Sequence, residues 1–161
     1  SSEPVAQYLQ NRYFCILPTS TVYCKGQKYV SKADEVRQVE AYLKSQGVEH
    51  IELVVASSIG ADLAMAFLTS TELPIGHVFF DGGQFAQIQE LQKHLYFEFG
   101  SIEDHFKYRQ AVIEAYPCGN YPVFEGYDHM QYQIRDPKGF AEMLAFIAEQ
   151  DGMPKLPFIR K

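Results

Sequence analysis

The sequence lacks long hydrophobic runs and any concentration of positive charge. No apolar stretch approaches the roughly 20 residues that a membrane-spanning helix requires, and no segment has the pattern of a signal peptide. The 14 lysines and arginines are scattered and the formal net charge is −6, whereas nucleic acids and anionic membranes are bound by concentrated basic surfaces. We therefore expect a cytoplasmic protein that acts on a small molecule and binds neither nucleic acid nor membrane. The sequence indicates no oligomeric state.

Cysteine is scarce and does not form the spacing of a metal site. Cys15, Cys24 and Cys118 are an odd number, which favours a reducing cytoplasm, and the apolar neighbours of Cys15 predict a buried thiol. The five histidines show no paired ligand spacing either. No glycine-rich loop with a lysine follows a predicted strand, which argues against a nucleotide-binding protein. We predict a protein without metal or cofactor.

The length and composition are those of one globular domain. The chain has 161 residues, of which 47% are hydrophobic and 21% charged, which is enough for a sizeable core. We predict a single domain over residues 1–161, without internal repeats. The chain opens with Ser1-Ser2-Glu3-Pro4 and has no initiator methionine. It is therefore expected to be processed, trimmed or one part of a longer protein.

Apolar runs of strand length alternate with segments of helical periodicity. The runs predict five strands, at residues 13–17, 51–55, 77–80, 95–99 and 122–124. Helical spacing predicts helices over residues 5–10, 33–47, 63–68, 104–115 and 138–149, the second capped by Ser31. Strands separated by helices form a parallel sheet that is covered on both faces. We predict an α/β fold, a three-layer sandwich with a mostly parallel sheet.

The sharpest local signal is Ala56-Ser57-Ser58-Ile59-Gly60, between a predicted strand and a predicted helix. Small residues two positions before and after Ser58 let the backbones approach in a tight turn, which lifts the serine above the sheet as a nucleophile elbow does. The helix N-terminus directs backbone N–H groups, that of Ile59 among them, toward a developing oxyanion. Ser58 is favoured over Ser57 because only Ser58 has small residues at both flanking positions. The alternative is an ordinary turn whose serine only caps the helix.

Two polar segments further along the chain each follow a predicted strand. The first, Gly100-Ser101-Ile102-Glu103-Asp104, places two carboxylates shortly after a glycine. The second, Gly126-Tyr127-Asp128-His129, lies between the last predicted strand and the last predicted helix. Together with the elbow, these segments resemble the α/β-hydrolase superfamily. In the order of elements the resemblance extends over nearly the whole chain: residues 13–18 are similar to a family strand before the elbow, and residues 136–147 to its last helix.

The resemblance implies a catalytic triad in which serine, acid and histidine follow one another along the chain. It assigns Ser58 as the nucleophile, His129 as the general base and a carboxylate of the first polar segment as the acid. Glu103 has the common spacing from the glycine and is slightly favoured, whereas Asp104 has the more usual residue type. His105 lies too close to the acid turn to be the base. The implied activity is acyl transfer by a serine hydrolase, most simply a carboxylesterase-like activity on a small ester.

Two features of the family are missing from the sequence. The family usually begins with a strand and a His-Gly-type loop that supplies a second oxyanion donor, and here the chain starts near the helix after that loop. The family also commonly carries a cap after the strand that ends near Asp81, and we expect this cap to be missing or deleted near residues 84–93. Loss of one oxyanion donor typically lowers turnover about a hundred- to a thousandfold. The alternative is therefore a catalytically inactive hydrolase-fold protein that acts as a ligand receptor or an interaction module.

Overall fold

The computed structural model describes residues 3–21, 24–26, 28–82 and 94–152. At the centre is a four-stranded sheet of order β1-β2-β3-β4, in which every pair of neighbours is parallel. The strands are β1 (Ile51–Ser57), β2 (Ile75–Asp81), β3 (His94–Gly100) and β4 (Val123–Phe124). The parallel sheet confirms the predicted α/β class and four of the five predicted strands.

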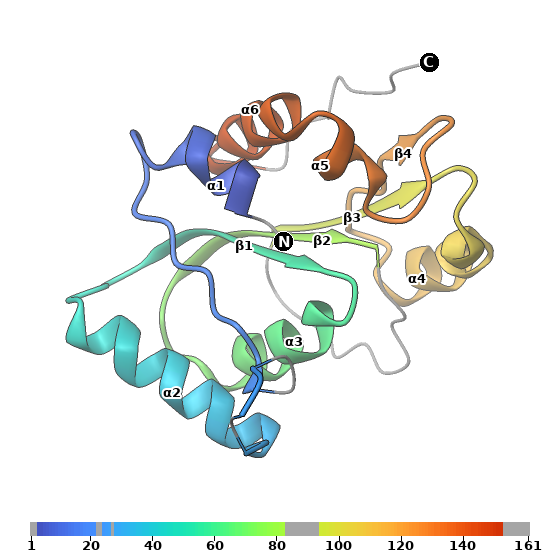
Figure 1. The fold of residues 1–161 in the computed structure, drawn as a ribbon. Coiled ribbons are helices and arrows are strands. Elements are labelled where there is room, and N and C mark those ends of the chain that lie inside the picture. The colour runs from blue at the N-terminus through green and yellow to red at the C-terminus, as the bar shows by residue number, and fades with distance from the viewer. Residues whose placement is uncertain (1–2, 22–23, 27, 83–93, 153–161) are drawn as a thin grey trace.

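Helices cover both faces of the sheet, as a parallel sheet requires (Figure 1). One face is covered by α2 (Lys32–Ser45) and α3 (Gly60–Ser70), and the other by α1 (Glu3–Leu9), α5 (Gln131–Arg135) and α6 (Pro137–Ala148). The 3-10 helix η2 (Asp104–Tyr108) continues into α4 (Arg109–Ala115), whose Val112 shares a core with α2 and α3. The predicted three-layer sandwich is confirmed.

Two apolar cores hold the layers together, one on each face of the sheet. Val78 and Phe80 of β2 belong to the core shared with α2 and α3, while Phe79 between them belongs to the core shared with α6. All three side chains are fully buried. Because successive residues of a strand face opposite sides, a strand covered on both faces carries a continuous apolar run. This explains the uninterrupted apolar run in the middle of β2.

Local sequence determines where two of the helices begin. Ser31 Oγ accepts a hydrogen bond from the Asp34 N–H at 3.2 Å, which confirms Ser31 as the N-cap of α2. In the same way the Asp136 side chain accepts from the Gly139 N–H at 2.8 Å, and a proline occupies the first turn of α6. The first residues of these two helices can be predicted from sequence because each capping residue and its hydrogen-bond partner are only three positions apart.

The strand predicted at residues 13–17 is wrong. These residues form no strand, and Phe14 and Leu17 are 67% and 43% exposed. The segment runs from the layer of α1 to the layer of α2, with Ile16 packed on the core (Figure 1). An apolar run becomes a strand only where another strand pairs with its backbone, and within the described residues β1 pairs with β2 alone. Cys15, predicted to be buried, is half-buried.

Two helical segments differ from the prediction. Residues 104–115 divide into η2 and α4, and the loop after His129 contains α5, which the sequence analysis did not predict. α5 has five residues and follows Met130, which has a left-handed conformation with φ of 56°. So short a helix lacks the repeated apolar spacing on which a prediction depends. The deletion expected at residues 84–93 lies outside the described residues.

Candidate active site

A turn of two residues, Ser58 and Ile59, joins β1 to α3. Ser58 has φ of 52°, and within the described part of the chain only one other non-glycine residue has positive φ. Hydrogen bonds hold this conformation on both sides: the Ser58 N–H donates to the Asp81 carbonyl at 3.1 Å, and the Ser58 carbonyl accepts from the Ala61 N–H at 3.0 Å. The left-handed conformation costs a non-glycine residue roughly 1–2 kcal/mol. Non-glycine residues held in this conformation cluster at active sites, ligand-binding sites and switch regions.

The small residues on either side of Ser58 differ in their surroundings. Ala56 is 4% exposed and lies in the core beneath α3. A Cβ built on Gly60, in contrast, meets nothing within 4 Å. The sequence predicts that both positions require a small residue. Packing explains this requirement at Ala56, whereas at Gly60 there is space for a side chain.

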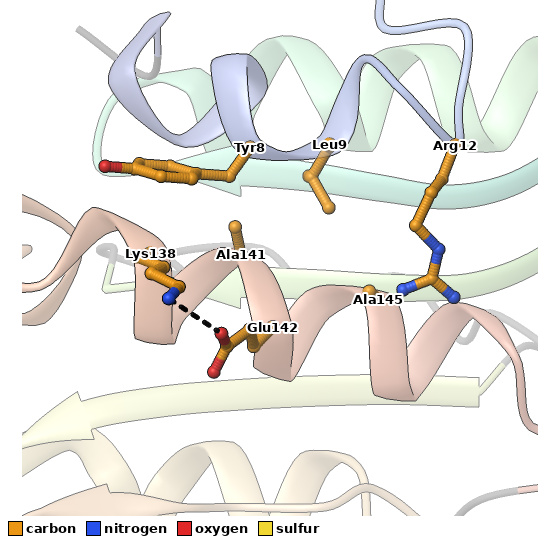
Figure 2. A pocket seen from close by; sticks show the side chains of 7 residues that line it. All are labelled: Tyr8, Leu9, Arg12, Lys138, Ala141, Glu142 and Ala145. Atoms are coloured by element: carbon orange, nitrogen blue, oxygen red, sulfur yellow. Dashed lines mark ion pairs between the residues drawn. The ribbon is translucent and has the colours of Figure 1, made fainter.

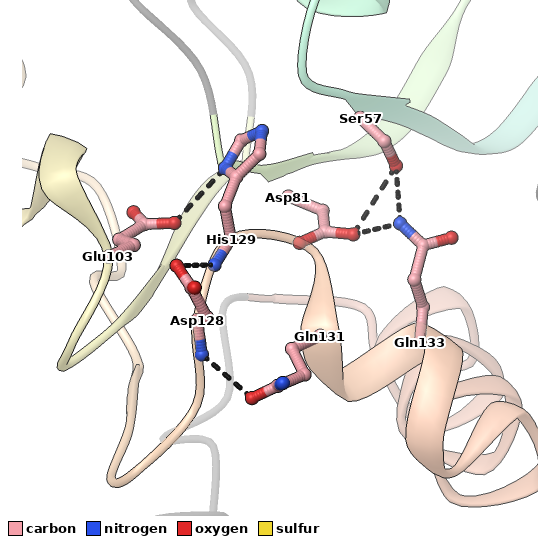
Figure 3. A network of polar contacts seen from close by, with 7 residues as sticks. All are labelled: Ser57, Asp81, Glu103, Asp128, His129, Gln131 and Gln133. Carbon is pink, nitrogen blue, oxygen red and sulfur yellow. Dashed lines mark hydrogen bonds and ion pairs between the residues drawn. The ribbon is translucent and has the colours of Figure 1, made fainter.

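His129 and Glu103 lie against each other at the carboxyl end of the sheet (Figure 3). Nδ1 of His129 is 3.1 Å from Oε2 of Glu103, whose side chain is 1% exposed while that of His129 is 27% exposed. Burial raises the pKa of the Glu103 carboxyl, and the hydrogen bond and charge of His129 oppose that rise. A carboxylate accepts from an N–H, so the proton of a neutral imidazole resides on Nδ1 and Nε2 keeps its lone pair.

Of the two carboxylates that the sequence left open, Glu103 is the one that contacts the imidazole. Asp104 is exposed and begins η2. His105, also in η2, stands edge-on to His129 with ring centroids 5.2 Å apart. The backbone of His129 is held by Asp128, whose Oδ1 accepts the His129 N–H at 2.7 Å. Both histidines thus lie beside Glu103, but only His129 bonds to it through a described hydrogen bond.

Two glycines make room for the loop that carries His129. A Cβ at Gly82 would lie 2.5 Å from both Cε1 and Nδ1 of His129, and φ of Gly82 is +64°. A Cβ at Gly100 would lie 2.2 Å from the carbonyl oxygen of Tyr127. Neither position has space for a side chain while the loop keeps this course. The sequence analysis used Gly100 only to place the acid and did not single out Gly82, because the contacts that require these glycines are between segments distant in the chain.

Ser58 and His129 contact two consecutive residues at the end of β2, Asp81 and Gly82. The Ser58 N–H is bonded to Asp81, and the ring of His129 packs on Gly82. No hydrogen bond between the described residues joins the Ser58 hydroxyl to the imidazole. The ring nitrogen that is not bonded to Glu103 points away from that carboxylate (Figure 3). The geometry therefore brings His129 and Glu103 into contact, and it holds Ser58 at Asp81, the residue before the Gly82 on which His129 packs.

Ile59 presents its backbone at the start of α3. Its side chain is 66% exposed. Among the described residues its N–H donates to no backbone carbonyl. A backbone N–H at the beginning of a helix is suited to bind an anion. Ile59 directly follows Ser58 in the chain.

A second polar network, which the sequence analysis missed, lies beneath the turn (Figure 3). Gln133 of α5 donates from Nε2 to Ser57 Oγ at 3.0 Å and to Asp81 Oδ2, and the Ser57 hydroxyl donates to the same Asp81 oxygen at 3.3 Å. Asp81 is paired in register with Glu98 of β3. Asp81, Glu98 and Gln133 are all nearly fully buried. The available signal was the carboxylate in each of two apolar strands, at Asp81 and Glu98.

A shallow pocket lies elsewhere, between α1 and α6, and has a volume of about 110 Å³ (Figure 2). Its lining residues are Tyr8, Leu9, Arg12, Lys138, Ala141, Glu142 and Ala145. The charged groups at its rim are engaged, Lys138 with Glu142 at 3.9 Å and Arg12 with Glu149. Since no residue of the Ser58 turn or the His129 loop lines it, this pocket is separate from the candidate site.

In the described ranges, no group of three or more histidine, cysteine, aspartate or glutamate side chains could hold a metal ion. No helix in the same ranges is both long enough and apolar enough to cross a membrane. The three cysteines are not bridged.

Comparison with known proteins gave structural matches only. No protein-family model matches the chain, and no curated protein matches it. A protein of unknown function from Agrobacterium tumefaciens, described as a putative α/β hydrolase, has a TM-score of 0.67 at 13% identity, over 89% of this chain and 74% of that one. An α/β hydrolase enzyme from the metagenome of sediments of the lagoon of Mar Chica has a TM-score of 0.63 at 10% identity, over 80% and 74%.

A third solved structure, a predicted CIB-like hydrolase from Thermoplasma acidophilum, has a TM-score of 0.61 at 12% identity. The match covers 74% of this chain and 61% of that protein, so the chain spans less than two thirds of its length. Identities this low establish the fold alone. The chain has the fold of the α/β hydrolases, as the resemblance of its polar segments implied.

Proposed function

We propose that the chain carries the catalytic core of a serine hydrolase, with Ser58 as the nucleophile, His129 as the general base and Glu103 as the acid. The single observation that supports this best is the hydrogen bond between the His129 imidazole and the buried Glu103 carboxyl. Ser58 is hydrogen-bonded to Asp81, the last residue of β2, at the same end of the sheet. The strained backbone of Ser58 adds to it. Asp104 is not part of this proposal, because it is exposed and belongs to η2.

The reaction that this arrangement supports is acyl transfer, most simply the hydrolysis of a small ester. The Ser58 hydroxyl attacks the carbonyl carbon while His129 Nε2 takes its proton, and Glu103 stabilises the resulting imidazolium. The tetrahedral oxyanion accepts a hydrogen bond from the N–H of Ile59. Collapse of the intermediate expels the alcohol, which receives the proton from His129. A water molecule then attacks the acyl-enzyme by the same route, and no cofactor is needed.

The proposal requires the Ser58 hydroxyl and the imidazole to come together when substrate binds. Catalytic hydrogen bonds are often long or poorly aligned in a free enzyme and shorten in the complex. The backbone of Ser58 is already held by Asp81 and Ala61.

A second candidate is a hydrolase-fold protein without activity, which acts as a ligand receptor or an interaction module. The observation that favours it is the missing hydrogen bond between Ser58 and His129. A receptor of this kind would keep the fold but would not activate the serine. The two candidates therefore differ in one measurable property, the reactivity of Ser58.

The deciding experiment is intact-mass analysis after incubation with a fluorophosphonate, a reagent that phosphonylates activated serines. We expect a single adduct on the native chain, the same adduct on Ser57→Ala, and none on Ser58→Ala. The neighbouring serine is the matched control, because it directly precedes Ser58 at the end of β1 and its hydroxyl is already hydrogen-bonded to Asp81. A folded native chain that gains no adduct would favour the receptor, and an adduct that persists in Ser58→Ala would exclude Ser58 as the nucleophile.

A further inference from the structure

Three polar side chains form a row across the ends of neighbouring strands, beneath the turn that carries Ser58. Ser57 of β1 is in register with Asp81 of β2, and Asp81 is in register with Glu98 of β3. Asp81 and Glu98 stand two positions after Phe79 and Tyr96, which belong to the core on the α6 side of the sheet. Ser57 stands four positions after Leu53, which packs against the same core, so the row faces α5 and α6. Gln133 of α5 closes the row from above by bonding to both Ser57 and Asp81.

The two carboxyl groups of this row are buried and belong to residues paired in register on neighbouring strands. Asp81 is 1% exposed and Glu98 3%. Two adjacent carboxylates cannot both remain charged without water or a cation, so one of the two retains a proton. Burial and the contact with Asp81 raise the pKa of Glu98 well above its usual value.

The partners of Asp81 indicate which of the two groups is the anion. Its Oδ2 accepts hydrogen bonds from Gln133 and from the Ser57 hydroxyl, which stabilise the charged form. Its Oδ1 is buried and receives no hydrogen from any described N–H or hydroxyl group. A proton on the Glu98 carboxyl, directed at that oxygen, gives Asp81 Oδ1 the partner that it otherwise lacks.

We propose that Asp81 and Glu98 share one proton, carried by Glu98, and that this pair is a positioning element for the turn of Ser58. The positioning role rests on the proposed function. Asp81 acts on the turn in two ways: its carbonyl holds the Ser58 N–H, and its carboxylate holds the Ser57 hydroxyl. Neither Asp81 nor Glu98 touches the reacting atoms.

The pair also keeps the charge beside the triad low. Among the described residues, the titratable group that acts on Glu98 besides Asp81 is Glu103, from the turn after β3, and Glu103 in turn has His129 and His105 as neighbours. From α5 and β1 the facing groups, Gln133 and Ser57, are neutral. Loss of the shared proton at alkaline pH puts a second negative charge next to Asp81 and Glu103. The contact between the two carboxyls then becomes repulsive and the turn loses its support.

The first test needs no activity and uses the native chain. Side-chain carboxyl groups labelled with ¹³C are titrated by NMR, with assignments from Asp81→Asn and Glu98→Gln. We expect one carboxyl that is still protonated at neutral pH, and we expect it to be absent from Glu98→Gln. A native chain whose carboxyls are all ionised at neutral pH would overturn the proposal, as would a protonated carboxyl that persists in Glu98→Gln.

The second test is the rate at which the fluorophosphonate labels Ser58, measured against pH. We expect the native rate to fall at alkaline pH and Glu98→Gln to lack this fall, because an amide donates to Asp81 but cannot lose its proton. Asp81→Asn should slow labelling about a hundredfold, the usual effect of a displacement near 1 Å in a catalytic group. Glu142→Gln, on the exposed side of α6, is the control and should match the native profile.

A residue needed only for folding would lower the rate without changing the shape of the pH profile. An alkaline fall that survives in Glu98→Gln would therefore overturn the positioning role. A native chain that takes up no label at all would refute the proposed function and with it this role, while the NMR titration would still decide on the shared proton. The two failures are thus distinguishable.

Discussion

Two histidines near opposite ends of β2 differ in what surrounds them: His77 lies within the strand, and His129 lies in the loop that packs on Gly82. His77, near the start of β2, is 2% exposed. Its Nε2 is 2.8 Å from the carbonyl oxygen of Gln150, and its Nδ1 is 3.2 Å from the hydroxyl of Tyr96. A carbonyl only accepts, so Nε2 carries the proton and Nδ1 accepts from Tyr96. Both nitrogens of His77 are therefore occupied by neutral partners, and burial lowers its pKa.

His129, near the end of β2, has one partner and that partner is a carboxyl group. Its ring is partly exposed, and the nitrogen not bonded to Glu103 is open. Burial and a larger number of hydrogen bonds therefore do not by themselves suit a histidine to act as a base. A general base needs a partner that stabilises its charged form and a nitrogen left open for the substrate's proton. His77 has neither, so it is a link between α6 and the sheet.

The largest effect on the reactivity of Ser58 is expected from removing the imidazole of His129. We expect His129→Ala to slow fluorophosphonate labelling by about 10⁴-fold, the upper end of the contribution of general-base catalysis. Glu103→Gln should slow it nearly as much, because the amide favours the wrong imidazole tautomer. The matched control is His105→Ala, whose ring is 5.2 Å from that of His129. Second-order labelling rates test this prediction, and equal losses in the two histidine variants would contradict it.

A smaller effect is expected from a methyl group placed beside the His129 ring. In Gly82→Ala the new Cβ lies 2.5 Å from the ring, so the imidazole must move by about 1 Å, which typically costs about a hundredfold in rate. Gly47→Ala is the control, because Gly47 has a similar φ of +67° but open space around its Cβ position. Both variants should lose about 1 kcal/mol of stability for the left-handed conformation. Only Gly82→Ala should lose labelling, and a slow Gly47→Ala would point to a general loss of structure.

On the other side of the comparison, we expect loss of His77 to affect stability alone. His77→Leu leaves the buried Tyr96 hydroxyl and the Gln150 carbonyl without a partner, which should cost about 1–3 kcal/mol. His50→Leu is the control, since His50 is exposed and its pairing with Glu52 contributes little at the surface. Urea unfolding measures the difference. Labelling of Ser58 should continue at the native rate in both variants, and a slow His77→Leu would mean that His77 acts on the site.

The elements that could be predicted from the sequence are those whose signals come from residues close together in the chain. The cap at Ser31, the apolar run of β2 and the strand-turn-helix around Ser58 depend on residues a few positions apart, and the fold class followed from their order. The run at residues 13–17 has the composition of a strand, but strand formation depends on a pairing partner that composition does not contain. α5 has only five residues, too few to show the apolar periodicity from which a helix is predicted.

The candidate site shows the same division. The sequence left Glu103 and Asp104 open because both follow Gly100 closely, and the choice depends on which carboxyl the loop of His129 reaches. The need for glycine at Gly82 and the bond from Gln133 to Asp81 arise where distant segments meet. Such contacts are consequences of the tertiary fold, so a single sequence could name candidate residues for the chemistry but not the residues that contact and position them.

The smallest and sharpest prediction concerns the pH dependence of stability that His77 causes. The pKa of His77 is lowered in the folded chain, while in the unfolded chain it is near the usual 6.5. Above that value the imidazole is neutral in both states, and its contribution to stability is fully present. Below it the unfolded chain binds a proton that the folded chain does not. Stability is therefore lost as the pH falls through about 6.5, by at most ~1.4 kcal/mol per pH unit, until the folded pKa is reached.

Other groups act in the opposite direction and must be separated from His77. Burial raises the pKa values of Glu98 and Glu103, so their stabilising contribution is present at low pH and is lost as the pH rises through the folded pKa. Both groups are present in the native chain and in His77→Leu, so their effect cancels in the difference between the two stability curves. Urea unfolding at several pH values between about 5 and 8 gives these curves. A difference that shrinks as the pH falls below about 6.5 follows from a neutral, buried His77, whereas parallel curves would mean that this histidine titrates as it does in the unfolded chain.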